Sequence, residues 1–261
     1  MVKWRNPLTE SEQEEWERFS VKSKSGSLIQ GMYAKTTQQN PKGTIVLGHP
    51  MGKEAKGYFF KRYYTHILRD NGFNTVVFDI NGFGESSHGN FSFFEDIIAV
   101  SIKAKELTPN LPIGYHGISL GAMYSTVAFT DVTHKFDFAI VESSSTTLAE
   151  FWVQFPFAYK VLKILSVVMP KYERKVDFKE RIKEVKHLQC ILFIYSERDS
   201  WIPLIMGKKL QENANVSTEF WLAKDAEHAE IMRSPDKEAY QERILKFFNQ
   251  EVVKCNKEKN S

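Results

Sequence analysis

Cysteine is scarce in this 261-residue chain, which contains only Cys190 and Cys255. The two lie far apart in sequence, and Cys190 opens an apolar run whereas Cys255 lies in a polar segment. This usage favours neither a disulfide scaffold nor a metal site. The core is therefore expected to form without cross-links, and a hydrophobic content of 42% is sufficient for that.

Long hydrophobic runs are also absent. The longest apolar-rich stretch, 161–169, is interrupted by Lys163 and is too short to span a bilayer. Residues 1–7 lack the apolar segment of a secretory signal. The sequence therefore predicts no membrane span and a cytoplasmic location.

The chain carries little net charge. Its 35 Lys and Arg residues against 32 Asp and Glu residues give a formal charge of +3. Such a balance gives no electrostatic reason to expect nucleic acid or a strongly acidic partner. The length suits one large α/β domain or two small ones. We expect a small-molecule substrate as the partner, and the oligomeric state stays open.

Short apolar runs alternate with helical patterns along the chain. Continuously apolar runs are typical of strands buried on both faces of a parallel sheet, and their alternation with helices predicts helices on both of those faces. The first two strands are expected to form an antiparallel hairpin through a turn at 25–27. Strands are predicted at 19–24, 28–35, 44–47, 74–80, 111–118, 136–141, 190–196 and 218–222, and helices at 58–68, 93–107, 120–129, 205–214 and 235–248.

One segment, 143–186, interrupts the alternation because it is too long for a simple crossover helix and is rich in aromatic and aliphatic residues. We interpret it as a helical cap inserted over the active end of the sheet, with a pair of ordinary packing helices as the alternative. The predicted organisation is a leader at 1–18, an α/β core at 19–142 and 187–250, the cap at 143–186, and a frayed polar tail at 251–261.

A Gly-x-Ser-x-Gly pattern spans 117–121, with Ser119 in the middle. The apolar stretch before it predicts a strand and the stretch after it predicts a helix, so Ser119 would lie on the sharp turn between them. Glycine is expected at positions 117 and 121 because larger side chains would collide with neighbouring backbone there. A serine hydroxyl needs a base to become a nucleophile, and that base needs a carboxylate to orient it.

The predicted base and acid follow later strands. His228 is the candidate base because it lies in a polar loop between the last strand and the last helix, at the same end of the sheet as the serine. Asp199 is the candidate acid because it follows a buried strand, at the edge where ligands bind in such sheets. Three other carboxylates are rivals for the acid: Glu197, Asp79 and Asp225.

An oxyanion that develops on the substrate needs backbone N–H donors. One expected donor is Leu120, the first residue of the helix after Ser119, where the helix dipole adds favourable charge. The other is Met51, in the loop after the strand at 44–47, since Pro50 has no N–H to give. A plain strand-to-helix turn is the alternative interpretation of this loop.

Five motifs occur in order along the chain: Gly48-His49-Pro50-Met51-Gly52, Asp79-Ile80-Asn81-Gly82-Phe83-Gly84-Glu85-Ser86, Gly117-Ile118-Ser119-Leu120-Gly121, Asp199 with Pro203, and His228. Together they resemble the motifs of the α/β-hydrolase superfamily, and within it the serine aminopeptidase S33 and monoacylglycerol lipase type of small bacterial hydrolase. The resemblance covers roughly 19–250 and implies an eight-stranded, mostly parallel sheet, a cap after the sixth strand, hydrolysis of an ester, thioester or amide, and no cofactor. One departure is His49-Pro50, where such families often have His-Gly.

Three hypotheses for function remain open. The first is a carboxylesterase or lipase-like enzyme acting on a small or medium-chain acyl ester, with Phe151, Trp152 and Phe155 lining an acyl pocket unless they only pack the cap. The second is an amidase, aminopeptidase or thioesterase of the same fold, in which Glu142 and Glu150 would bind a substrate ammonium. The third is a non-catalytic binding protein on a hydrolase fold.

Overall fold

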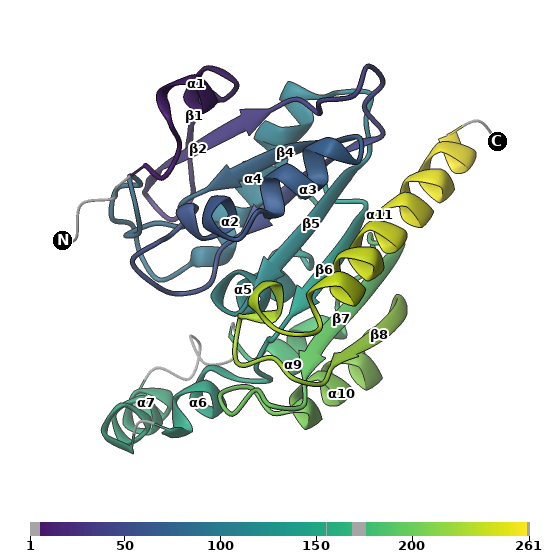
Figure 1. Cartoon of the computed structure of the whole chain (residues 1–261). Helices are drawn as coiled ribbons and strands as arrows, with labels where there is room; N and C mark the ends of the chain where they lie inside the picture. The colour runs from purple at the N-terminus through teal and green to yellow at the C-terminus, as the bar shows by residue number, and fades with distance from the viewer. Residues whose placement is uncertain (1–5, 155, 169–175, 260–261) are drawn as a thin grey trace.

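The computed structural model describes residues 6–154, 156–168 and 176–259. Its centre is one eight-stranded sheet with the strand order β1-β2-β4-β3-β5-β6-β7-β8 (Figure 1). β2 pairs antiparallel with both β1 and β4, and the other neighbours pair in parallel. The mostly parallel sheet with an antiparallel hairpin at its edge is confirmed. The strands are β1 (Glu17–Lys22), β2 (Leu28–Ala34), β3 (Gly43–Gly48), β4 (Phe73–Phe78), β5 (Ile113–Ile118), β6 (Phe138–Glu142), β7 (Cys190–Ser196) and β8 (Ser217–Ala223).

Helices cover both faces of the sheet, as Figure 1 shows. One buried cluster joins the sheet to α2, α3 and α11, and it includes Phe59, Leu68 and Phe248. A second cluster joins the opposite face to α4, α5, α9 and α10, and it includes Phe178 and Leu210. Two core layers therefore enclose the parallel strands. These helices are α2 (Gly57–Lys61), α3 (Tyr64–Asp70), α4 (Phe93–Leu107), α5 (Leu120–Ala128), α9 (Phe178–Ile182), α10 (Leu204–Asn213) and α11 (Lys237–Lys259).

The helix predicted at 58–68 is divided into α2 and α3. The break lies at Tyr63, whose φ of 60° is left-handed and cannot continue a helix. Helical spacing of apolar residues continues across the break, so the sequence pattern does not reveal it. The break leaves Arg62 at the C-terminal end of α2.

The segment between β6 and β7 combines two different parts. At its end, α9 buries Phe178 and Ile182 against α5 and α10, so this portion of the predicted 143–186 insertion is a crossover helix of the body. Before it come α6 (Leu148–Phe151), the 3₁₀ helix η1 (Trp152–Gln154) and α7 (Pro156–Val168). The last of these contacts mainly η1 and projects from the body, exposing Phe157 and Ile164 (Figure 1).

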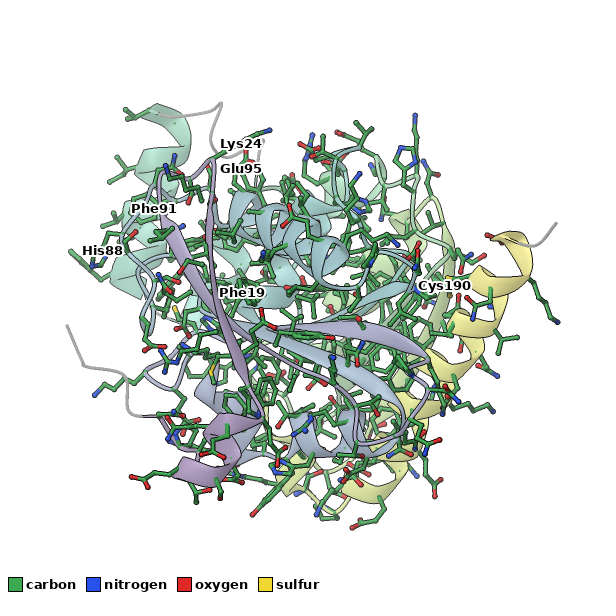
Figure 2. The ribbon with its side chains drawn as sticks, turned by 90° about the horizontal axis from the view of Figure 1, so that it is seen from above. Phe19, Lys24, His88, Phe91, Glu95 and Cys190 are labelled. Atoms are coloured by element: carbon green, nitrogen blue, oxygen red, sulfur yellow. The ribbon has the colours of Figure 1, made fainter. Side chains whose placement is uncertain are left out.

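The described segment before the hairpin, residues 6–16, packs against the body of the molecule, whereas the sequence predicted a leader at 1–18. It contains α1 (Glu10–Glu14), which Thr9 caps at its N-terminus. Trp16 is buried and meets the ring of Phe60 edge-on, with 4.9 Å between the ring centroids. Figure 2 shows Phe19 on β1, where its ring lies over Gly31 of β2. These contacts fasten the antiparallel edge to the core.

The prediction of a frayed tail at 251–261 is wrong for its described part, because α11 continues to Lys259. Glu251, Val252 and Cys255 are all buried against the sheet. Most residues of this segment lie on the outer side of the helix and are polar, so its composition does not reveal the three buried residues. Within the described ranges, no helix combines the length and the apolar character that crossing a membrane requires.

Two adjacent valines test the packing of the α11 end. Val252 is 4% exposed and approaches Gly43 of β3, whereas Val253 is 51% exposed. Val252→Ala should lower the free energy of unfolding by about 1.5–3 kcal/mol, because its side chain is removed from water on folding. Val253→Ala, measured in the same urea titration, should change it by about 0.5 kcal/mol or less. If both variants lowered the free energy of unfolding by the same small amount, Val252 would not be packed against the sheet.

Candidate active site

Ser119 lies on a sharp turn between β5 and α5. Its backbone adopts φ 52° and ψ −110°, a left-handed conformation that a residue with a side chain rarely adopts. The surrounding structure maintains this strain, since Ser119 N–H donates to the carbonyl of Glu142 at 2.9 Å and Met123 N–H donates to the Ser119 carbonyl at 2.8 Å. The turn therefore presents the hydroxyl at the carboxyl end of the parallel strands.

The two glycines of the motif allow this turn to pack. A Cβ at Gly121 would lie 2.2 Å from the carbonyl oxygen of Gly48, and one at Gly117 would lie 2.7 Å from the backbone of Gly121. Gly121 N–H also donates to the carbonyl of His49 at 3.1 Å. The close approach expected from the sequence is thus present, and it holds the end of β3 against the start of α5.

Ser119, His228 and Asp199 form one hydrogen-bonded chain. The Ser119 Oγ lies 2.9 Å from His228 Nε2, and His228 Nδ1 lies 2.8 Å from Asp199 Oδ2. The other Asp199 oxygen accepts the backbone N–H groups of Trp201 and Ile202 at 2.9 and 2.8 Å. This geometry fits an imidazole that carries its hydrogen on Nδ1 and accepts the serine hydroxyl at Nε2.

The rival carboxylates have other environments. Glu197 is exposed, and Asp225 pairs with Arg198 at 2.9 Å. Asp79 is buried and forms an ion pair with the buried Lys56, in keeping with a structural turn. Among the four carboxylates considered from the sequence, Asp199 is the one that contacts His228.

Leu120 and Met51 flank the hydroxyl as the expected N–H donors. Leu120 is the first residue of α5, and in the described part of the chain neither its N–H nor that of Met51 donates a hydrogen bond to the protein. Met51 lines the same pocket as Ser119. Both N–H groups can therefore act as donors to a bound molecule.

His49 orients the peptide that contains Met51 N–H. Its Nε2 accepts the N–H of Ile80 at 3.0 Å, and its Nδ1 donates to the carbonyl of Pro50 at 2.8 Å. Burial lowers the pKa of His49, which keeps this ring neutral at neutral pH. Because the carbonyl and the N–H of one peptide point in opposite directions, fixing the Pro50 carbonyl fixes the Met51 N–H.

A pocket of about 270 Å³ opens beside Ser119 and His228. Phe151 and Trp201 form apolar walls, and Trp201 stacks on His228 with 5.8 Å between the ring centroids. Of the predicted substrate-binding residues, Phe151 lines this pocket, whereas Trp152 packs edge-on against Phe151 and is not part of the lining. Phe155 lies outside the described residues.

The two carboxylates proposed to bind an ammonium do not line the pocket. Glu142 is fully buried, and it interacts with His116 and Tyr240 beneath the sheet edge. Glu150 lies on α6 outside the lining. The sequence placed both near the start of the cap, but only the strand register shows that Glu142 points into the core.

Four polar residues of the pocket were not identified from the sequence: Glu54, Tyr58, Arg62 and Glu230. Arg62 donates to Glu54 and to Glu230, each at 2.6 Å, and its guanidinium lies 4.0 Å above the ring of Tyr58. Burial alone would lower the pKa of Arg62, but its bonds to Glu230 and Glu54 raise the pKa above the ordinary value. The Arg62 guanidinium therefore connects Glu54, in the loop that contains Met51, to Glu230, in the loop that contains His228. The sequence signal was weak, because the contacts depend on the break at residue 63.

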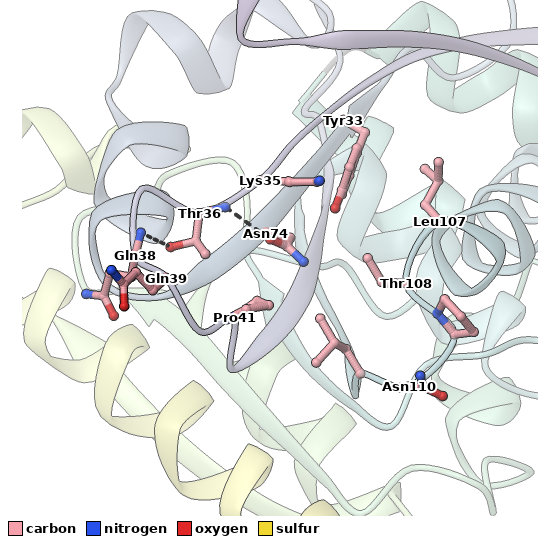
Figure 3. Close-up of a pocket in the computed structure, with 12 residues that line it drawn as sticks. Tyr33, Lys35, Thr36, Gln38, Gln39, Pro41, Asn74, Leu107, Thr108 and Asn110 are labelled. Atoms are coloured by element: carbon pink, nitrogen blue, oxygen red, sulfur yellow. Dashed lines mark hydrogen bonds between the residues drawn. The ribbon is translucent and has the colours of Figure 1, made fainter.

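A second, larger pocket lies at the opposite end of the parallel strands (Figure 3). Its volume is about 380 Å³, and its lining includes Lys35, Asn74 and the turn at 107–111 that precedes β5. These residues lie at the amino ends of the parallel strands, away from Ser119. The smaller pocket is therefore the candidate active site.

Tyr58 gives a direct test of how the histidine loop is held. Its hydroxyl donates at 2.5 Å to the carbonyl of Ala229, a buried residue with φ 57° that follows His228. Tyr58→Phe should lower the free energy of unfolding by about 1–3 kcal/mol, since a buried carbonyl loses its donor. The exposed Tyr63 provides the control variant Tyr63→Phe. Identical denaturation curves for the two variants would contradict this role.

The chain is similar in sequence to known proteins. A family model described as serine aminopeptidase, S33 matches residues 39–217. The curated protein YqkD of Bacillus subtilis strain 168, named as uncharacterized, is 25% identical over 254 residues that span 91% of this chain and 81% of YqkD.

Solved structures show the same fold at lower sequence identity. The esterase Pf2001 of Pyrococcus furiosus has a TM-score of 0.75 and 17% identity, and the match covers 95% of this chain and 98% of the esterase. The acylaminoacyl peptidase of Pyrococcus horikoshii has a TM-score of 0.69 and 18% identity, with 91% of this chain and 42% of the peptidase covered. Together with the family match over most of its length, these likenesses identify the chain as an α/β-hydrolase that belongs to the serine aminopeptidase S33 family.

Proposed function

We propose that this protein is a serine hydrolase of small or medium-chain acyl esters, in which Ser119 is the nucleophile, His228 the general base and Asp199 the acid that orients it. The observation that carries the proposal is the continuous hydrogen-bonded chain from Ser119 Oγ through both nitrogens of His228 to Asp199. A serine hydroxyl is a weak nucleophile by itself, and such a chain is the arrangement that activates it.

The first half of the proposed reaction forms an acyl-enzyme. His228 Nε2 takes the hydroxyl proton as Ser119 Oγ attacks the ester carbonyl carbon, and Asp199 stabilises the imidazolium from the Nδ1 side. The N–H groups of Leu120 and Met51 donate to the developing oxyanion. His228 then gives its proton to the departing alcohol, which leaves the acyl group on Ser119.

The second half releases the acid. Water occupies the position of the alcohol and loses a proton to His228 as its oxygen attacks the acyl carbon. The tetrahedral intermediate collapses, the proton returns to Ser119 Oγ, and the carboxylic acid departs. The chain's own residues account for each proton transfer in both halves.

The lining of the pocket supports an apolar acyl or alcohol group. Phe151, Trp201 and Met51 contribute apolar surface beside Ser119. Phe151 belongs to α6, so the proposed cap comprises α6, η1 and α7 and supplies one wall of the pocket. The proposal makes Trp152 a support for Phe151 and assigns it no substrate contact.

An amidase or aminopeptidase is the second candidate. The pocket contains Glu54 and Glu230, whose carboxylates can bind a substrate ammonium, and the printed family name and the acylaminoacyl peptidase likeness agree with an amide substrate. Both carboxylates are already paired with Arg62, which favours an uncharged ester over an amine. Thioesters follow the same steps, and a non-catalytic binding protein would show no turnover.

A substrate panel tests the proposed function. The wild-type protein should hydrolyse p-nitrophenyl esters of graded acyl length faster than aminoacyl p-nitroanilides, because Phe151 and Trp201 form apolar walls and both carboxylates of the pocket are already paired with Arg62. Ser119→Ala should lower kcat by roughly 10⁶-fold, as the loss of a triad nucleophile does. Turnover that persists in this variant would refute Ser119 as the nucleophile. Faster turnover of the anilides would favour the aminopeptidase instead.

Two aspartates test the identity of the acid. Asp199→Asn should lower kcat by about 10⁴-fold with the fold unchanged, because the amide no longer holds the required tautomer of His228. Asp225→Asn removes the same charge close to His228 in sequence, but from an exposed ion pair with Arg198, and should leave kcat within about twofold. Steady-state ester hydrolysis measures both. Comparable losses in the two variants would argue against Asp199 as the orienting acid.

A further inference from the structure

Three potential metal ligands meet at the edge of the molecule opposite the active site. Cys190 is the first residue of β7, Glu219 lies on β8, and Glu251 lies on α11. One candidate ligand atom from each residue, the Cys190 sulfur and a carboxylate oxygen of each glutamate, lies within 4.8 Å of the other two. Figure 2 shows Cys190 beside the C-terminal helix. Cys190 stands at the amino end of its strand, so this cluster is separate from Ser119.

Strand register explains why the two sheet residues meet. Leu192 pairs with Glu219 across β7 and β8, and Cys190 lies two residues before Leu192, on the same face of the sheet. That face packs against α11, whose inward side carries Glu251. The fold thus directs one thiol and two carboxylates into the same space between the sheet and the helix.

The cluster contains a buried oxygen without a partner. Glu251 is 0% exposed, and its Oε2 has no hydrogen-bond donor in the described part of the chain. Its Oε1 pairs with Lys254 at 2.5 Å, and Glu219 pairs with Arg243. Cys190, at 2% exposure, adds a soft sulfur ligand. An unpaired buried carboxylate oxygen is costly, and a cation between the three groups would satisfy it.

We propose that Cys190, Glu219 and Glu251 bind one divalent cation of the zinc class, as a structural site that joins the last two strands to the C-terminal helix. Thiolate and carboxylate are ligands that Zn²⁺ accepts in tetrahedral geometry, with water as the fourth ligand. On binding, a metal–sulfur bond forms, the thiol proton passes to solvent, and no electron is transferred. Lys254, whose side chain is 55% exposed, can withdraw toward solvent.

The sequence predicted no metal site because the three ligands lie on distant segments and lack the short spacing of metal-binding motifs. The inference does not depend on the proposed hydrolase activity, because its readout is metal binding itself. Cobalt(II) is the probe, since it adopts zinc-like tetrahedral geometry and its bond to a thiolate produces a charge-transfer absorption band.

The test is a titration of chelator-treated, full-length protein with Co²⁺, followed by absorption spectroscopy. The wild-type protein should develop the thiolate-to-cobalt band to saturation at one equivalent and lose it when Zn²⁺ is added. Cys190→Ser should abolish the band, and Glu251→Gln should weaken Co²⁺ binding by about tenfold or more, since one charged ligand is lost.

The second cysteine provides the matched control. Cys255 is also buried on α11 and hydrogen-bonds to Gln189, so Cys255→Ser removes a similar thiol that is not part of the cluster. This variant should keep the band. Circular dichroism establishes that each variant is folded, and Cys190→Ala serves as a second variant if the serine disrupts folding. A folded wild-type protein without the band, or a band that persists without Cys190, would overturn the proposal.

Discussion

Close backbone packing between Gly121 and the end of β3 is the constraint on which the position of Ser119 depends. A Cβ at position 121 would lie 2.2 Å from the Gly48 carbonyl oxygen, so only glycine allows α5 to start there. That start places Leu120 N–H at the helix N-terminus and forces Ser119 into its left-handed turn. The strain at Ser119 is maintained by the bond of its N–H to the Glu142 carbonyl. One steric requirement thus sets the positions of the hydroxyl and of an N–H donor.

Charged and polar contacts then tie the separate loops to this turn. Lys56 pairs with Asp79 and Glu85 beneath the Met51 loop, and Arg62 connects that loop to Glu230 beside His228. Buried ion pairs contribute little net stability, because desolvation offsets their attraction. These ion pairs instead fix the positions of the loops, since each pair forms only in one arrangement of the two loops that it joins. The hydrophobic layers hold the sheet, and the ion pairs hold its functional edge.

The sequence was sufficient to predict the sheet and the chain of Ser119, His228 and Asp199, because each of these residues follows an apolar strand in a parallel sheet. It could not identify Arg62, since helical spacing continues through a break that only the φ of Tyr63 reveals. It misjudged the end of α11, where three buried residues lie within a polar sequence. It also placed Glu142 near the substrate, although strand register directs that side chain into the core. Such contacts depend on pairings between distant segments, which local patterns do not encode.

Covalent labelling is the most direct test of the proposal that Ser119 is the reactive nucleophile. The folded protein would be treated with a fluorophosphonate probe, digested, and mapped by mass spectrometry. One adduct is expected, on the peptide that contains Ser119, and it should be lost when His228 is replaced by asparagine. A folded protein that remains unlabelled, or that carries the adduct at another residue, would show that Ser119 is not the nucleophile.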